Sequence, residues 1–307
     1  MPDPQPNRTL PYALVDVFAE HALEGNMLAI FHDARGLSTA QMQALARETN
    51  LAETTFIFPQ ESPQTDADHG VNVRIFTTQE ELPFAGHPTL GTASWLYANH
   101  PALRGAETIT LRLAGGNVPV RFSSPAPGET GVFGTMRQHD PTFGEVHDHA
   151  EVARLLGVPL EDLDPSLPIQ TVSTGLPFCI VPFRSVAALS RLAIPQAATQ
   201  AWLEAADAKF FFSLAPTDID QGADFRCRMQ FYNGEDPATG SAAGCAIAWL
   251  VRYGVVPSER PTLFAQGVEI LRPARLHVKA CRVGDQISDV FVGGRTIQVA
   301  SGQFFLP

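Results

Sequence analysis

The sequence is poor in positive charge. Its 307 residues include 21 lysines and arginines against 32 aspartates and glutamates, which gives a formal net charge of −11. A protein that binds nucleic acid or an anionic membrane needs basic residues to meet the phosphates. No apolar run approaches the roughly 20 residues of a membrane-spanning helix. The composition therefore predicts a protein that binds neither nucleic acid nor membrane.

Cysteines and cofactor motifs are also scarce. The four cysteines are far apart in the chain, which argues against a disulfide framework or a zinc knuckle. The N-terminal residues carry acid and proline where a secretory signal has basic and then apolar residues, so we expect a cytoplasmic protein. The chain has no GxGxxG motif, no Walker loop and no nucleophile elbow. We therefore expect no cofactor.

His147 and His149 are the nearest approach to a metal site. Their side chains would share one face of a strand, but no further ligand stands at a defined spacing from them. Asp148, between them, is explained more simply as the N-cap of a helix that Gly157 ends. We therefore expect no metal.

Apolar residues are plentiful, at 45% of the chain, and two helical segments lack any polar face. These segments are Pro88–Tyr97 and Ser241–Tyr253. A helix that is apolar all round must be buried on every side. We therefore expect each helix to lie inside a wrapper of strands.

Local signals divide the chain further. Ser38 and Gln41 form a capping box, which predicts a helix, whereas the proline-containing stretch 59–70 is expected to be a loop. Serine, proline and glycine cluster at 123–131, which predicts a linker. Two domains are the expectation for this length. Their expected limits are 9–122, which the strand at 296–307 is a candidate to rejoin, and 131–295.

An internal repeat is the strongest signal of organisation. When the chain is shifted by 154 residues, Val73–Leu96 lies over Cys227–Leu250 without a gap, and six of 24 positions are identical. Chance would give about one or two matches. The identical pairs are Arg74/Arg228, Glu81/Glu235, Pro83/Pro237, Gly86/Gly240, Trp95/Trp249 and Leu96/Leu250. A strand, a glycine-containing loop and a buried helix match in the same order, so we expect two similar lobes.

Each copy of the repeat has a loop that leads into its buried helix. The loops are Leu82–His87 and Asp236–Ser241. A helix N-terminus presents unpaired N–H groups and a positive dipole end, and Gly86 and Gly240 let a ligand approach the backbone closely. We expect the two loops to hold one small anionic substrate. The alternative is a local cap at each helix, for which Ser241 is suited.

Polar side chains near these loops are candidates for chemistry. His87 opens the first helix, and Asp236 suits a substrate amine or hydroxyl unless it only caps its own turn. Glu53 lies among apolar neighbours between a helix and a strand, a setting that suits general acid/base catalysis. Position alone does not separate Glu53 from Glu48 and Glu81.

The motifs around these residues resemble those of the phenazine-biosynthesis isomerase (PhzF-like) family. The resemblance covers nearly the whole chain. It is carried by Asp16–Phe18 with Glu24–Asn26, Asn50–Phe56, Glu81–Pro88, Thr174–Pro177, Glu235–Ser241 and Gln266–Ile270 followed by Arg272-Pro273. It implies the diaminopimelate epimerase-like fold, an α+β protein of two pseudo-symmetric lobes. Each lobe would be a curved mixed sheet or barrel around a central buried helix.

The resemblance also implies roles for individual residues. The family's acid/base glutamate falls on Glu53, and its substrate-contacting side chains fall on His87, Asp236 and Ser241. The backbone at Gly86 and Gly240 corresponds to family groups near the substrate. Leu271 and Ala274 stand where the family usually has glycine and serine, which puts the local strand geometry there in question. Because the family often forms homodimers, we expect a homodimer.

We interpret the chain as a cofactor-independent isomerase. Glu53 would remove a proton from an activated carbon of a small carboxylate-bearing substrate and return it elsewhere, with His87, Asp236 and Ser241 lining the same cleft. One alternative is amino-acid epimerisation, but that needs two opposed bases, and the two cysteines of related epimerases are absent from the helix starts. The other is a non-catalytic binding protein of the same fold, which has no need of a base.

Overall fold

The computed structural model describes residues 8–123, 130–217, 222–232 and 234–306. The chain divides into two compact units. The N-terminal unit comprises Met1–Leu23, Met27–Met136 and Arg295–Pro307, and the C-terminal unit comprises Glu24–Asn26 and Arg137–Gly294. Strand β8 (Val132–Arg137) joins the N-terminal unit because it pairs with β7 (Gly116–Ser123). The domain limits expected from the sequence stay predictions, and residues 124–129 of the expected linker lie outside the described part.

Eight strands of the N-terminal unit form a closed barrel. Their order is β1, β2, β3, β4, β6, β7, β8 and β18, and β18 pairs back onto β1. The further bounds are β1 (Arg8–Val17), β2 (Asn26–Phe31), β3 (Thr54–Phe58), β4 (Val71–Phe76), β6 (Thr108–Leu113) and β18 (Gln286–Leu306), and the short β5 (Glu81–Leu82) pairs with β4. Strand β4 shows why the sequence takes this form: Val71, Val73 and Ile75 are buried at every second position, as a strand with one face on a core requires.

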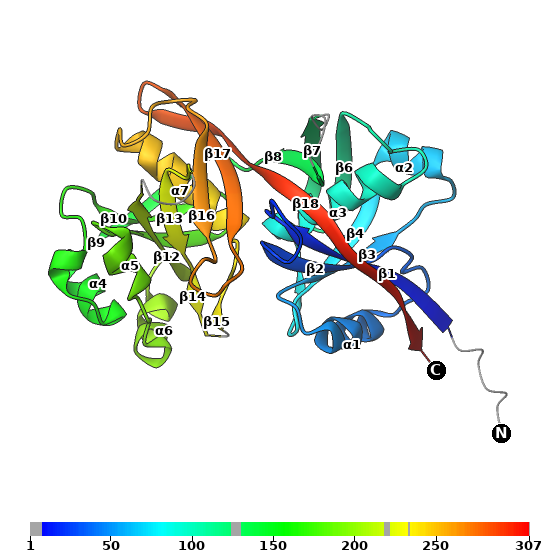
Figure 1. Ribbon diagram of the computed structural model, residues 1–307, viewed down its shortest axis with the longest axis horizontal. Coiled ribbons are helices and arrows are strands. Elements are labelled where there is room, and N and C mark those ends of the chain that lie inside the picture. The colour runs from blue at the N-terminus through cyan, green and yellow to red at the C-terminus, as the bar shows by residue number, and fades with distance from the viewer. Residues whose placement is uncertain (1–7, 124–129, 218–221, 233, 307) are drawn as a thin grey trace. The chain divides into compact units, whose positions relative to one another are not determined.

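Helix α3 (Gly86–Asn99) forms the core of this barrel. It contacts β1, β3, β6 and β7, and Figure 1 shows it among these strands. Gly91 allows a close approach, because a Cβ atom there would lie 2.7 Å from side-chain atoms of both Leu28 and Val17. The buried helix expected at Pro88–Tyr97 is confirmed, and it begins two residues earlier than expected.

Two shorter helices belong to the same unit. Helix α1 (Thr39–Thr49) begins at the predicted capping box of Ser38 and Gln41, and its apolar face packs on an aromatic cluster of the barrel strands. The prediction of a loop over residues 59–70 is wrong in part, because helix α2 (Pro63–His69) forms within this stretch. The Ser62 side chain caps α2 and proline occupies its first turn, where a missing N–H costs nothing.

The C-terminal unit is built on the remaining strands of the same hydrogen-bonded sheet. Its strand order is β18, β17, β16, β13, β12, β11, β10 and β9. The bounds are β9 (Thr142–His147), β10 (Ile169–Ser173), β11 (Pro177–Pro182), β12 (Phe210–Pro216), β13 (Phe225–Arg228), β16 (Thr262–Gln266) and β17 (Ala274–Val283). Strand β18 serves both units, since its first part pairs with β17 and its last part with β1. A separate hairpin joins β14 (Gln230–Phe231) to β15 (Gly234–Glu235).

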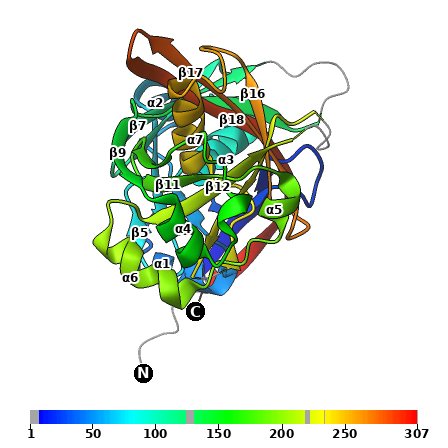
Figure 2. The same ribbon diagram turned by 90° about the vertical axis from the view of Figure 1, so that its left-hand side faces the viewer.

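Helix α7 (Gly240–Arg252) is the buried helix of the C-terminal unit. It contacts β10, β11 and β17, and its residues from Ala242 to Val251 are all buried. Three other helices, α4 (His149–Leu156), α5 (Val186–Ser190) and α6 (Gln196–Ala205), share an apolar cluster with β11 and β12, and Figure 2 shows α4 and α6 together on one side of this unit. Asp148 caps α4 and Gly157 ends it, as predicted.

The predicted fold class is confirmed: each unit is a curved sheet around one buried helix. Within the described ranges, none of the helices combines the length and the apolar character that crossing a bilayer requires.

Candidate functional site

The N-terminal unit brings Glu53 next to His87. Glu53 immediately precedes β3, and His87 lies in the first turn of α3. Nε2 of His87 is 3.5 Å from Oε2 of Glu53. Strand β3 pairs in parallel with β2, which contains Met27, and the backbone of Met27 hydrogen-bonds the His87 ring. The start of β3 and the first turn of α3 thus bring the two side chains together, beside the backbone of β2.

The surroundings of this pair keep the imidazole neutral. The His87 side chain is only 6% exposed. Burial lowers its pKa to about 3, and the hydrogen bond to the Met27 backbone raises the pKa by a smaller amount. The Glu53 side chain is 18% exposed, so a small molecule can reach it. The pair therefore combines an accessible carboxyl group with a buried, neutral ring.

The two other candidate glutamates have different surroundings. Glu48 is exposed on α1. Glu81 forms an ion pair with Arg74, with 2.5 Å between Oε2 and Nη2. The Glu81 carboxylate is therefore engaged by an arginine, and Glu48 points away from the barrel core into solvent. Of the three glutamates, Glu53 has the surroundings best suited to proton transfer.

In the C-terminal unit, Asp236 lies within a hydrogen-bond network. Asn26 Nδ2 donates to its Oδ1 at 2.8 Å, and Thr239 Oγ1 donates to its Oδ2 at 2.6 Å. Burial raises the pKa of Asp236 to about 6, while these bonds and one from the backbone of Ala238 lower it. Asp236 therefore does stabilise its own turn, as the alternative interpretation proposed. A contact between Asp236 and substrate stays a prediction.

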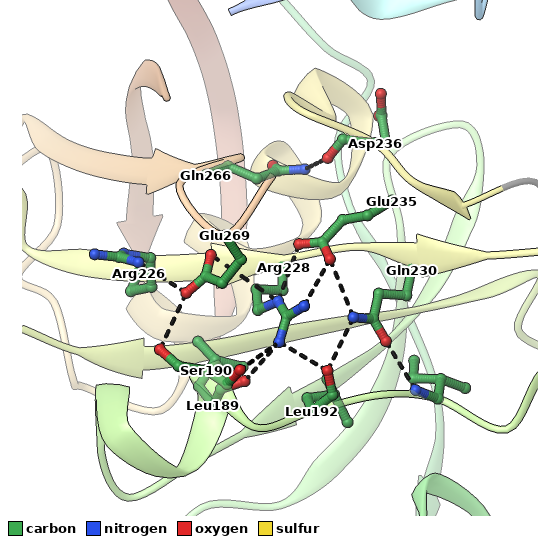
Figure 3. A network of polar contacts seen from close by, with 11 residues as sticks. Leu189, Ser190, Leu192, Arg226, Arg228, Gln230, Glu235, Asp236, Gln266 and Glu269 are labelled. Atoms are coloured by element: carbon green, nitrogen blue, oxygen red, sulfur yellow. Dashed lines mark hydrogen bonds and ion pairs between the residues drawn. The ribbon is translucent and has the colours of Figure 1, made fainter. Parts of the chain in front are cut away.

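Gln266, at the end of β16, fixes the same turn. Its Nε2 donates to the backbone oxygen of Asp236 at 2.8 Å (Figure 3). The same Nε2 donates to Thr239 Oγ1 at 2.9 Å, and Oε1 accepts from the Thr239 N–H at 3.1 Å. The next residue, Gly267, has φ +73°, and a Cβ atom there would lie 2.7 Å from the backbone oxygen of Pro237. Only glycine fits this close approach without strain.

The first turns of α3 and α7 both contain predicted site residues. Helix α7 begins at Gly240 with Thr239 as its N-cap residue, so Ser241 lies inside the helix, and the alternative that Ser241 caps it is wrong. Helix α3 begins at Gly86 with Ala85 as its N-cap residue. Across the described residues, neither N-cap side chain makes a capping hydrogen bond. The positive ends of both helices are thus left uncovered by a capping side chain.

A buried ion pair supports the hairpin that leads to Asp236. Arg228 and Glu235 are joined by two bonds, Nε to Oε1 at 2.9 Å and Nη2 to Oε2 at 2.6 Å, and their side chains are 6% and 7% exposed (Figure 3). The remaining guanidinium nitrogen of Arg228 donates to the backbone oxygens of Leu189, Ser190 and Leu192. Because Glu235 directly precedes Asp236, this ion pair fixes the start of the Asp236 loop.

The six site residues predicted from the sequence form two local groups. Glu53, Gly86 and His87 belong to the N-terminal unit, and Asp236, Gly240 and Ser241 belong to the C-terminal unit. Sequence reasoning assigned no role to Asn26, Thr239 or Gln266. These neutral side chains are not acids, bases or nucleophiles, so their residue types do not mark them as catalytic. Each lies in a segment that carries the family resemblance, and this position was the signal that could have identified them. In the ranges that the structure covers, no three or more histidine, cysteine or acidic side chains gather as a metal site would require.

Comparisons with known proteins agree with this architecture. The model of the phenazine biosynthesis-like protein family (PhzC-PhzF) matches residues 15–302. A trans-2,3-dihydro-3-hydroxyanthranilate isomerase from Pseudomonas aeruginosa is 36% identical, over 96% of this chain and 99% of that protein. A structure described as a predicted epimerase from the same species has a TM-score of 0.80 and 35% identity, over 96% and 99% of the two chains. A PhzF-family protein from Bacillus anthracis has a TM-score of 0.85 and 25% identity, over 97% and 100%. The chain is therefore an isomerase that belongs to the phenazine biosynthesis-like family.

Proposed function

We propose that this isomerase moves a proton on a small carboxylate-bearing substrate by acid/base catalysis at Glu53. The observation that carries the proposal is the approach of Glu53 to within 3.5 Å of the buried, neutral His87. An accessible carboxyl group beside a ring with a strongly shifted pKa is an arrangement typical of catalytic sites.

The reaction begins with ionised Glu53. Its carboxylate removes a proton from a carbon, and the electron pair of the broken C–H bond moves into a neighbouring π-system or carboxylate of the substrate. The protonated Glu53 then returns the proton to another carbon. A neutral imidazole has a single N–H, and the bond to the Met27 backbone uses it. Nε2 of His87 therefore faces Glu53 as an acceptor, which favours the protonated glutamate formed between the two steps.

The proposed binding groups are side chains of the Asp236 loop and backbone N–H groups at the starts of α3 and α7. Asp236 would accept a hydrogen bond from an amine or hydroxyl of the substrate. The first-turn N–H groups at Gly86 and Gly240 and the hydroxyl of Ser241 would bind its carboxylate, since helix N-termini favour anions. The uncapped starts of α3 and α7 support this assignment.

Epimerisation by two cysteines receives no support from the thiols. Burial raises the pKa of Cys179, Cys227 and Cys245, so these side chains stay protonated near neutral pH and are poor bases. None of them lies at the start of α3 or in the first turn of α7. A single glutamate that returns its proton at a different carbon fits the N-terminal group better than a pair of opposed thiolates.

The substrate named for the Pseudomonas relative, trans-2,3-dihydro-3-hydroxyanthranilate, is the first compound to test. We expect the wild type to isomerise it or a related small carboxylate. Glu53→Gln keeps the size of the side chain and removes the base, so kcat should fall by roughly 10²- to 10⁴-fold. Glu48→Gln, five residues earlier and exposed, is the matched control and should keep wild-type activity. Near wild-type activity in Glu53→Gln would contradict the proposal.

We propose a small anionic substrate, a cytoplasmic location and a homodimer. The homodimer is tested by sedimentation equilibrium at micromolar concentration, where a mass near the 33.2 kDa of one chain would contradict it.

A further inference from the structure

We infer that Gln266 is a positioning residue that acts through the Thr239 hydroxyl to fix how the Asp236 carboxylate accepts hydrogen bonds. The inference rests on the proposed role of Asp236 in binding the substrate. It extends that role to two residues that make no proposed contact with the substrate themselves. Both are buried: the exposed fractions are 0% for Gln266 and 8% for Thr239.

The orientation of the Gln266 amide is settled by its partners. Oε1 lies 3.1 Å from the backbone N–H of Thr239, which can only donate, so this end of the amide is the oxygen. The Nε2 group has two hydrogens. One is donated to the backbone oxygen of Asp236 and the other to Thr239 Oγ1. The amide therefore has no freedom to flip.

This orientation determines the direction of the Thr239 hydroxyl. Because Thr239 Oγ1 accepts from Gln266, its own hydrogen is free to be donated to Asp236 Oδ2, which lies 2.6 Å away. The other carboxylate oxygen meets a donor fixed in the same manner. Nδ2 of Asn26 donates to the backbone oxygen of Ala238 at 3.0 Å and to Asp236 Oδ1 at 2.8 Å.

The network thus favours an ionised Asp236, whose carboxylate accepts bonds from Asn26, Thr239 and the backbone of Ala238. The charged neighbour that opposes this state is Glu235 on β15, and Arg228 binds that carboxylate. The groups that face Asp236 from β2 and β16 are the neutral Asn26 and Gln266. In the proposed complex, an ammonium or hydroxyl group of the substrate would donate a further hydrogen bond to this carboxylate.

The test removes one link of the network at a time. Thr239→Val and Gln266→Leu delete the donors while keeping much of the volume, and Thr239→Ser restores the hydroxyl. Thr171→Val is the matched control, because Thr171 is also buried in this unit and its hydroxyl bonds His147. The measurements are the carboxyl titration of Asp236 by carbon-13 NMR, assigned with Asp236→Asn, and the pH dependence of kcat/KM.

We expect the Asp236 titration to move to higher pH by about one unit in Thr239→Val and Gln266→Leu, because a lost donor disfavours the charged form. Thr239→Ser and Thr171→Val should titrate as the wild type does. The acidic limb of kcat/KM should move with the titration, and KM should rise more than kcat falls.

The inference would be overturned if, in both deletion variants, the Asp236 titration midpoint lay within about 0.2 pKa units of the wild-type midpoint. If Gln266→Leu does not fold, the comparison of Thr239→Val with Thr239→Ser decides alone. A moved titration with unchanged kinetics would uphold the network and refute the proposed contact between Asp236 and the substrate. The two failures are therefore distinguishable.

Discussion

The two copies of the internal repeat share one hairpin geometry. In the N-terminal unit Phe76 pairs with Glu81, and in the C-terminal unit Gln230, 154 residues after Phe76, pairs with Glu235. Both hairpins carry an arginine–glutamate pair with the same two bonds, Nε to Oε1 and Nη2 to Oε2. The backbone scaffold of strand, hairpin, glycine loop and buried helix has thus been kept in both copies.

The surroundings of the two ion pairs differ. The side chains of Arg74 and Glu81 are each 31% exposed, and the guanidinium lies 5.1 Å from the ring centre of Phe76. Arg228 and Glu235 are nearly inaccessible, and Arg228 also binds three backbone oxygens at the end of α5. The same pair is a surface contact in one copy and an element of the core in the other.

The loops that follow the hairpins differ even more. The positions of the N-terminal copy that match Asp236 and Thr239 hold Leu82 and Ala85. The side chains that form the Asp236 network are therefore not repeated in the first loop, where His87 instead lies beside the glutamate that precedes β3. The comparison teaches that one scaffold carries two kinds of polar group, a glutamate beside a buried histidine in one unit and a hydrogen-bonded aspartate in the other.

The largest expected difference concerns the stability of the two ion pairs. Arg228→Ala leaves the Glu235 carboxylate buried without its partner, so the free energy of unfolding should fall by about 3–5 kcal/mol. Arg74→Ala removes a partly exposed pair, so the loss should be about 1 kcal/mol or less. Urea denaturation of both variants at pH 7 measures the difference. Equal losses would show that burial does not separate the two copies.

The pH dependence of stability should have opposite signs at the two loops. The folded-state pKa of His87 is lowered to about 3, so its contribution to stability is complete above the unfolded value of about 6.5 and is lost as the pH falls. The folded-state pKa of Asp236 is raised to about 6, so its penalty grows as the pH rises from about 4. Each group contributes a slope of up to about 1.4 kcal/mol per pH unit.

Two variants separate these slopes. Between pH 4 and pH 6, the free energy of unfolding of wild type minus that of His87→Gln should increase with pH, by on the order of 1 kcal/mol per pH unit. The stability of wild type relative to Asp236→Asn should decrease over the same range. Guanidinium denaturation at each pH is the measurement, and slopes of one sign for both variants would contradict the assigned shifts.

The smallest expected effect is at Ser241. Ser241→Ala removes one hydrogen-bonding group at the start of α7, so KM should rise by roughly three- to tenfold, which corresponds to about 1 kcal/mol, with a smaller change in kcat. Ser213→Ala, at a buried position of β12, is the control and should leave KM unchanged. A loss of kcat with unchanged KM would show that Ser241 acts only in the transition state.

Much of the fold could be predicted because its signals are local. The capping box of Ser38 and Gln41 marks the start of α1, and the absence of a polar face predicts that α3 and α7 are buried. Helix α2 was missed because its prolines suggested a loop. Ser62 followed by Pro63 is a helix-start signal, and here it predicts the structure better than the polar composition of the stretch does.

The site depends on contacts that local patterns do not contain. The choice of Glu53 over Glu48 and Glu81 requires the parallel pairing of β2 with β3, and Asn26 is 210 residues from Asp236 in the sequence. The shifted pKa values of His87 and Asp236 arise from burial, which is a property of the folded chain. For this reason the sequence identified candidate residues, and the structure was needed to show what surrounds each of them.

The central claim is that Glu53 carries the proton, and one labelling experiment tests it most directly. Substrate is turned over in deuterated water by wild type, Glu48→Gln and Glu53→Gln, and the product is analysed by NMR. We expect wild type and Glu48→Gln to form product at the same rate, with deuterium at the new C–H bond in proportion to the exchange of the Glu53 proton with solvent before its return. Glu53→Gln should form product, labelled or unlabelled, far more slowly. Product formation by Glu53→Gln at the wild-type rate, with the same label, would contradict the account.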